Sequence, residues 1–172
     1  TLVSDVTVAM QAGLKRGESL PDPAIRMDID ASDIRFKLAP GLPALSAANA
    51  TMTMTGQTFA ATVPTGLFEV EGAPAIAFSE GKFAIADTWP RRPVGKASFN
   101  ARGEVESLLS FLATPVMREF SPIPLDSGAV RGAMDIKGSV TLPLGDNLKA
   151  SEVVVQASGT LSNLASDTLM AP

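Results

Sequence analysis

The chain has 172 residues, and 14 lysine and arginine residues against 18 aspartate and glutamate residues give it a net charge of −4. This acidic balance, without a basic cluster, argues against a nucleic-acid-binding surface. Histidine and cysteine are absent, which removes the commonest general base, the commonest metal ligand, thiolate chemistry and disulfide bridges. No apolar run approaches the roughly 20 residues that a transmembrane helix needs. We therefore expect no catalytic residue, no metal site and no cofactor.

Alternation of apolar and polar residues predicts that most of the N-terminal half is β-strand. Residues 31–33 interrupt one strand as a turn or a bulge, and residues 13–23 are expected to form a polar loop. Gly56-Gln57 indicates a two-residue hairpin. The predicted strands cover residues 2–10, 25–38, 48–55, 58–63, 67–70, 75–78 and 82–86.

A strand–helix–strand unit organises the second half. Residues 97–102 alternate, and the apolar residues that follow at helical spacing (Val105, Leu108, Leu109 and Leu112) predict an amphipathic helix over about residues 103–114. Pro115 ends this helix because a proline disfavours helical angles in the residue before it. An extended crossing is expected at 121–124. From 129 to 144 apolar residues occupy even positions, which predicts one long strand that Gly132 and Gly138 bend or bulge. A last strand is expected at 151–159.

These elements predict a mainly β fold: an antiparallel, strongly curved sheet with one or two helices, one of them packed on it. We expect a single β-rich domain over residues 1–172. Because the chain opens abruptly in a strand pattern, we also expect it to be a segment excised from a larger protein.

Three carboxylates close in sequence are the main candidates for ionic chemistry. Asp28 and Asp30 share one face of a predicted strand, and Asp33 follows. Oxygen ligands suit calcium or magnesium, but the segment lacks the glycine and terminal glutamate of a calcium loop. A solvated strand face is the stronger interpretation, and a carboxylate-dependent enzyme the weaker one.

The apolar strand faces are more informative. An ordinary core explains most of them, because a sheet buries one face under a helix or a second layer. The alternative is that part of this face lines an open groove that holds acyl chains, since one helix is a small cover for so many apolar side chains. The candidate groove residues are Met52, Met54, Phe83, Ile85, Phe99, Met134, Ile136 and Val140.

The segment from the strand ending in Ala101-Arg102-Gly103, through the helix that ends at Thr114-Pro115, to the run 132–144 resembles the AsmA-like family of bacterial envelope proteins, which is related to the TamB and YhdP groups. Glycine and apolar spacing between residues 41 and 87 also resembles the family's repeating β pattern. The resemblance implies a long, taco-like sheet with a hydrophobic channel, in a periplasm-spanning protein that an N-terminal helix anchors in the inner membrane.

The resemblance further implies non-enzymatic phospholipid transport between the two membranes and a role in outer-membrane biogenesis. The expected partners are phospholipid acyl chains and adjacent segments of the same chain, and no nucleic acid. The alternative is a structural or protein-interaction β-domain in envelope assembly that has no lipid contact.

Overall fold

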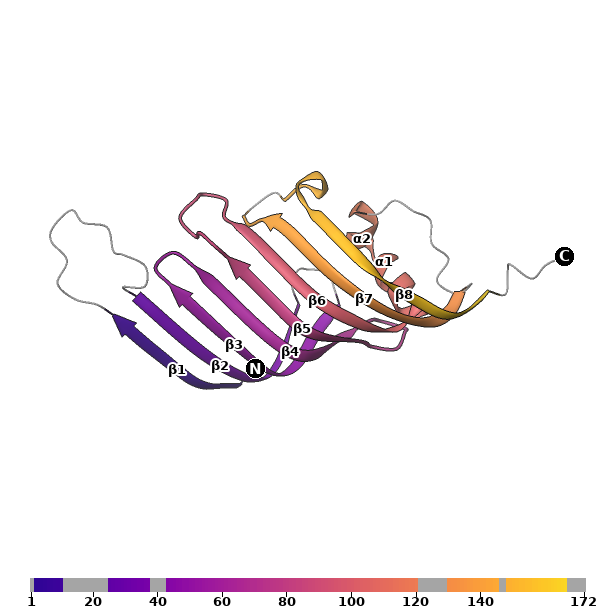
Figure 1. Cartoon of the computed structure of the whole chain (residues 1–172), viewed down its shortest axis with the longest axis horizontal. Helices are drawn as coiled ribbons and strands as arrows, with labels where there is room; N and C mark the ends of the chain where they lie inside the picture. Colours follow the sequence, from indigo (N-terminus) through magenta and orange to yellow (C-terminus); the bar gives the residue numbers. More distant parts are fainter. Residues whose placement is uncertain (1, 11–24, 38–42, 121–129, 146–147, 167–172) are drawn as a thin grey trace.

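The computed structural model describes residues 2–10, 25–37, 43–120, 130–145 and 148–166, and the statements below concern those residues. They form an eight-stranded antiparallel sheet in which each strand pairs with its neighbours in sequence, in the order β1 to β8 (Figure 1). The strands are β1 (Leu2–Met10), β2 (Ile25–Lys37), β3 (Ala44–Thr55), β4 (Phe59–Glu69), β5 (Ile76–Ile85), β6 (Val94–Glu104), β7 (Val130–Pro143) and β8 (Val154–Ser166). The helices are α1 (Val105–Leu112), α2 (Pro115–Phe120) and the short 3₁₀ helix η1 (Ala150–Glu152).

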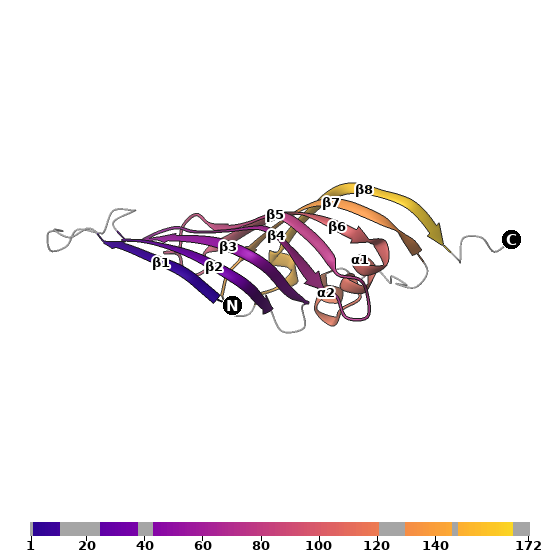
Figure 2. The same ribbon diagram turned by 90° about the horizontal axis from the view of Figure 1, so that it is seen from below.

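The predicted fold class is confirmed. The sheet is open and curled, and α1 and α2 lie on one side of it (Figure 2). None of the described helices is long and apolar enough to cross a membrane. The predicted loop at 13–23 and the predicted crossing at 121–124 lie outside the described residues.

The strand register sorts side chains onto two chemically distinct faces. Residues that pair across an antiparallel sheet point to the same face, so a row can be followed through all eight strands. We call one such row the apolar row: Val6, Ile29, Met52, Ala61, Phe83, Ala97, Val140 and Val155. The row beside it points to the opposite face, and we call it the polar row: Asp5, Asp30, Thr51, Thr62, Lys82, Ser98, Ser139 and Gln156.

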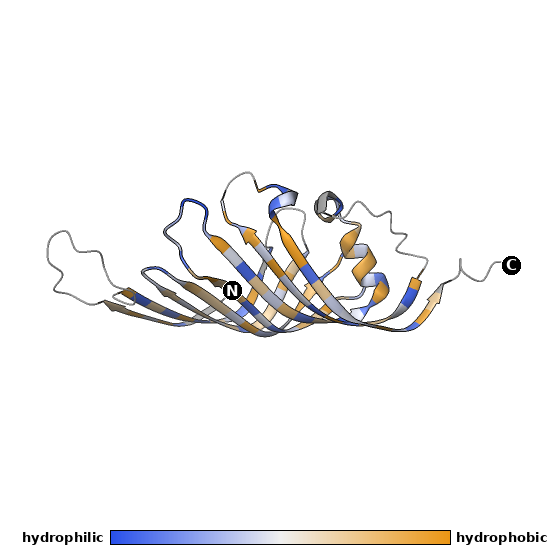
Figure 3. Cartoon of the chain, turned by 45° about the horizontal axis from the view of Figure 1, so that its top comes forward, coloured by the Kyte–Doolittle hydropathy of each residue, from blue (hydrophilic) through white to orange (hydrophobic). Residues whose placement is uncertain are grey.

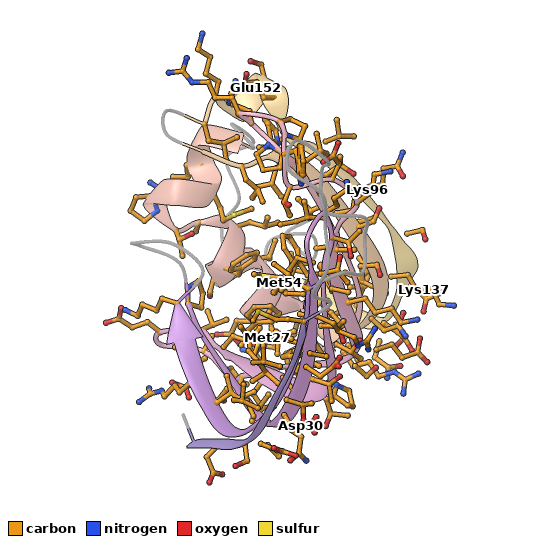
Figure 4. The ribbon with its side chains drawn as sticks, turned by 90° about the vertical axis from the view of Figure 1, so that its left-hand side faces the viewer. Met27, Asp30, Met54, Lys96, Lys137 and Glu152 are labelled. Carbon is orange, nitrogen blue, oxygen red and sulfur yellow. The ribbon has the colours of Figure 1, made fainter. Side chains whose placement is uncertain are left out.

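The apolar row lies on the concave face of the curled sheet, which is also the face that α1 contacts. Seen from one end, Met27 and Met54 point into the curve of the sheet, whereas Asp30, Lys96 and Lys137 point away from it (Figure 4). Colouring by hydropathy shows hydrophobic and hydrophilic residues interspersed along the strands that face the viewer (Figure 3). Below, "concave face" and "polar face" denote these two surfaces.

A line of kinks crosses β2 to β5. In each of these strands, two successive concave-face residues are three positions apart instead of two: Ala31 and Ile34, Ala47 and Ala50, Val63 and Gly66, and Phe78 and Gly81. Asp33 and Glu80 adopt left-handed backbone angles there, with φ of 49° and 54°. Because the kinks lie side by side, the pairing register between β2, β3, β4 and β5 is unchanged. The shift of one residue appears instead as two bulges, one where β1 pairs with β2 and one where β6 pairs with β5. Irregularities of this kind bend a sheet.

Phenylalanine rings lie over glycines of neighbouring strands. A Cβ atom added to Gly138 on β7 would lie 2.7 Å from the Phe99 ring, and one added to Gly95 on β6 would lie 2.8 Å from the Phe83 ring. These glycines leave room for a large side chain to lie flat along the sheet, so part of the concave face is covered by the sheet's own aromatic residues.

Helix α1 covers a limited area of the concave face, over β6 and β7. Its apolar side chains Leu108, Leu109 and Phe111 pack against a buried cluster that includes Ala101 and Met134. The helix ends where the Thr114 hydroxyl donates a hydrogen bond of 2.8 Å to the Phe111 carbonyl. Helix α2 then begins at Pro115, a residue suited to the first helical position because it needs no N–H partner there.

Several predicted strand and helix boundaries are wrong, because pairing with neighbouring strands overrides local turn signals. Gly103 does not open the helix but stays in β6, where it pairs with Met134. The separate strands expected at 58–63 and 67–70 are one strand, β4, and those at 75–78 and 82–86 are one strand, β5, since the kinks preserve the register. The last strand is Val154–Ser166 because its pairing with β7 continues past Gly159. The bulge expected at Gly132 is present, whereas none occurs at Gly138.

Candidate functional site

The concave face is the main candidate site, because much of it is apolar and not covered by protein. Among the described residues, the buried apolar side chains form two small clusters and include many alanines: Ala31, Ile34, Ala44, Leu45, Ala47, Ala50, Val70, Ile76, Phe78, Ala101, Val105 and Met134. Large apolar side chains of the same face are exposed beside them: Val6, Val8, Met10, Met54, Val155, Leu161 and Leu164. Apolar side chains left exposed along one face of a sheet are candidates for a ligand or partner surface.

The accessible surface of the whole chain agrees with this assignment. It is 11488 Å², whereas a compact monomer of 17.8 kDa exposes about 8,000 Å². An open single-layer sheet contributes to this larger surface, because one helix cannot cover a face that spans eight strands.

The candidate groove residues all lie on the concave face. Met52, Phe83 and Val140 belong to the apolar row. Met54 and Ile85 both pair with Phe59, so these two side chains lie together in a neighbouring row of the same face. The others pair closer to α1: Phe99 with Gly138, Ile136 with Ala101, and Met134 with Gly103.

Coverage separates these candidates from one another. Met54 is 45% exposed, whereas Met134 is 4% exposed beneath α1 and cannot touch a ligand while the helix is in place. Phe99 and Ile136 pack against the same cluster and are partly buried. The open part of the face therefore lies away from α1 and away from the buried cluster at the kinks, and it includes Met54 on β3 and the exposed side chains of β1 and β8.

Exposed residues at the two edges of the sheet were not among the candidates. Val6, Val8 and Met10 of β1 are 49%, 54% and 75% exposed. Their alternation is visible in the sequence, but their position on an edge strand is not. Leu161 and Leu164 of β8 lie beyond the predicted end of the last strand, so their place on the sheet could not be inferred from local pattern.

The polar face carries ion pairs within a strand and between strands. Asp28 accepts hydrogen bonds of 2.6 and 2.7 Å from Arg26 and one of 2.7 Å from Thr53, which together hold the pKa of that carboxyl below its usual value. Arg102 donates to Asp135 at 2.8 Å. These groups are exposed, and exposed pairs contribute little to stability, so they mainly keep this face solvated.

The three carboxylates considered as a cation site are not gathered around one point. Asp28 is engaged by Arg26 and Thr53, and Asp33 occupies a kink. Within the described ranges, no group of three or more acidic residues is arranged to hold a metal ion.

An open depression of about 630 Å³ follows the kinks. Most of its lining side chains belong to the polar face, including Asp33, Ser46, Thr65, Ser79 and Arg102. Its only charged residues are Asp33 and Arg102, and Arg102 already binds Asp135. It offers neither a nucleophile beside a base nor a dry cavity, so it is a weaker candidate than the concave face.

Comparisons with known proteins do not identify a family. No family model, no curated protein and no solved structure matches the chain.

Proposed function

We propose that the concave face holds the acyl chains of phospholipids, and that the chain acts without enzymatic chemistry as part of a lipid-carrying β-sheet. The observation that supports this proposal most strongly is the apolar row. It supplies an apolar side chain from each of the eight strands, and both of its ends are open, with Val6 49% and Val155 58% exposed.

The dimensions of the concave face suit acyl chains. Strands lie about 4.8 Å apart, so eight strands span roughly 34 Å. The acyl chains of one membrane leaflet span about half of the roughly 30 Å hydrocarbon core. One such chain therefore fits along the row with room for a second.

The chemistry of the face also favours a lipid. The apolar row holds no hydrogen-bonding side chain, so it would recognise a hydrocarbon chain and leave a headgroup in water. Met27, Met52 and Met54 cluster on β2 and β3, and flexible, polarizable methionine side chains adapt to ligands of variable shape.

The experiment is site-specific photocrosslinking. A benzophenone amino acid is placed at Met54 or Val140 on the concave face, or at Lys96 or Lys137 on the polar face of the same sheet. The purified chain is incubated with vesicles of phosphatidylethanolamine and phosphatidylglycerol, irradiated, and analysed by mass spectrometry of the intact protein. We expect lipid adducts from the two concave-face positions only.

Equal labelling from both faces would mean adsorption to the vesicle surface and would overturn the proposal, as would the absence of any lipid adduct. Capture of a second copy of the chain instead of lipid from Met54 would favour the alternative, a structural or interaction domain.

The cellular setting proposed for this activity rests on the resemblance to AsmA-like proteins. We propose a periplasmic location within a longer protein that is anchored in the inner membrane, where phospholipid must cross an aqueous space to reach the outer membrane. Lipid capture by the isolated chain tests the activity independently of that setting.

A further inference from the structure

The connections at one rim of the sheet carry the chain's single tryptophan, Trp89. At this rim β3 turns into β4 at Gly56-Gln57, residues 86–93 connect β5 to β6, and a connection that includes η1 joins β7 to β8 (Figure 1). Trp89 lies in the middle of the β5–β6 connection and is 62% exposed. A large aromatic side chain is costly to leave in water, so its exposure points to a contact outside the chain.

Hydrogen bonds hold the connection that carries Trp89 in place without covering the indole ring. The Trp89 side-chain N–H donates to the Gly56 carbonyl at 3.1 Å, and the Thr88 backbone N–H donates to the Gln57 carbonyl at 2.8 Å. The Asp87 carboxylate accepts a hydrogen bond of 3.0 Å from the Trp89 backbone N–H. The ring is therefore presented in a fixed position with its one donor already satisfied, and what it still offers is apolar surface.

The β7–β8 connection is fastened to the same structure. Arg92 donates to both carboxylate oxygens of Glu152 at 2.8 and 2.9 Å, and the Leu144 backbone N–H donates to the Pro93 carbonyl at 2.7 Å. The three connections therefore form one continuous surface, which we call the hairpin rim: residues 56–58, 86–93, 144–145 and 148–153.

Both longer connections of the hairpin rim expose an apolar side chain close in sequence to a cation. In the β5–β6 connection, Trp89 is followed by the exposed Arg91. In the β7–β8 connection, Leu148 is 38% exposed and is followed by the exposed Lys149. The same combination of apolar and cationic groups therefore recurs on two segments that the Arg92 ion pair holds together.

The charge that remains at the described hairpin rim after ion pairing is positive, although the whole chain has a net charge of −4. Glu152 is already paired. Arg91 and Lys149 then stand against one carboxylate, Asp87, and the exposed Lys96 adds a cation near the start of β6. The hairpin rim therefore favours an anionic partner.

We propose that the hairpin rim docks the chain on the surface of a bilayer that contains anionic phospholipid. Tryptophan is enriched at the interface between membrane and water, and each lysine or arginine near an anionic leaflet adds to the attraction. A soluble polyanion would engage the cations and leave the indole ring in water, whereas a bilayer accommodates both. Docking goes beyond the holding of lipid by the concave face and does not require it, because these groups lie on the connections and not on that face.

Trp89 is itself the probe, because the chain has no second tryptophan. The purified chain is titrated with vesicles of phosphatidylethanolamine and phosphatidylglycerol while tryptophan emission is recorded, and vesicle flotation measures binding independently. We expect the emission to shift to shorter wavelength and to be quenched by phospholipids brominated on their acyl chains. Binding to phosphatidylcholine vesicles, or at high salt, should be much weaker.

Substitutions compare the cations of the hairpin rim with a cation elsewhere. Arg91→Gln and Lys149→Gln should each weaken vesicle binding about fivefold. Lys137→Gln makes the same change in net charge on the polar face of β7 and should leave binding unchanged. Met54→Gln removes an exposed apolar side chain of the concave face without a change in charge, and it should also leave binding unchanged. All four sites are exposed, and far-UV circular dichroism checks the fold of each variant.

Three outcomes would overturn the proposal. The absence of both an emission shift and flotation would leave the hairpin rim to a protein partner. An equal loss of binding in Lys137→Gln would mean that net charge alone drives adsorption. A loss in Met54→Gln but not in Arg91→Gln or Lys149→Gln would place the membrane contact on the concave face, and the proposed function would stand without this docking surface. Conversely, docking through the rim without lipid adducts from Met54 would support this proposal and remove the proposed function.

Discussion

Two methionines on the same face provide a direct test of which part of that face is covered. Met134 lies beneath α1 and is 4% exposed, whereas Met54 on β3 is 45% exposed. Truncating each to alanine removes the same atoms. If α1 is the cover and the rest of the face is open, the two substitutions must differ strongly in their effect on the free energy of unfolding.

The magnitudes follow from burial. Replacing a buried methionine with alanine costs about 2–5 kcal/mol, because the lost transfer free energy adds to that of a cavity. Full burial of a methionine contributes about 1.5–3 kcal/mol, so a half-exposed one that leaves no enclosed cavity should cost about 1 kcal/mol or less. With a urea m-value of about 2 kcal/mol/M, the midpoint should fall by roughly 1–2.5 M for Met134→Ala and by at most about 0.5 M for Met54→Ala.

The assay is urea unfolding followed by far-UV circular dichroism, at a protein concentration at which sedimentation shows a monomer. Met54→Lys extends it, since a charge is tolerated at an open position, whereas Met134→Lys should prevent folding. Equal midpoint shifts for the two alanine variants would refute the reasoning, because they would mean that the face is closed in solution.

Three further predictions concern single sites. Gly138→Ala should destabilise the chain by about 1–3 kcal/mol through its clash with the Phe99 ring, and by less in a Phe99→Leu background, which a double-mutant cycle of urea midpoints measures. Ser107→Ala should raise the urea midpoint, because the Ser107 hydroxyl is fully buried with no hydrogen-bond partner in the described structure. Arg92, which donates at 2.8 and 2.9 Å, and the Lys149 backbone N–H lower the pKa of Glu152 from 4.5 to about 2. Stability from this pair is therefore complete above about pH 4.5 and lost as the pH falls towards 2, so the difference in Tm between the wild type and Glu152→Gln should shrink over that interval.

The alternation of side chains was readable from the sequence and needed no tertiary information. A strand turns its side chains to opposite faces with a period of two, so the assignment of Met52, Phe83 and Val140 to one face followed from local pattern. The β6–α1–β7 order and the hairpin at Gly56-Gln57 were predicted for the same reason, since their signals lie within a few residues of the structure they produce.

Whether a strand continues through a segment that resembles a turn depends on its pairing with neighbouring strands. Glu80-Gly81 has the local character of a turn, and it becomes a kink inside β5 because the neighbouring β4 is kinked at the same level and keeps its register. Local propensity could not reveal this, since β5 continues through the kink by pairing with β4, which is distant from local sequence signals.

Coverage of the apolar face was also a tertiary outcome. Met54 and Met134 both fall on apolar positions of alternating strands, yet one is half exposed and the other is sealed. The difference in exposure depends on where the eight-residue helix α1 packs and on which strands lie at the edges of the sheet. Periodicity reports which way a side chain points, whereas burial depends on what lies above it, and that is set by contacts between segments distant in sequence.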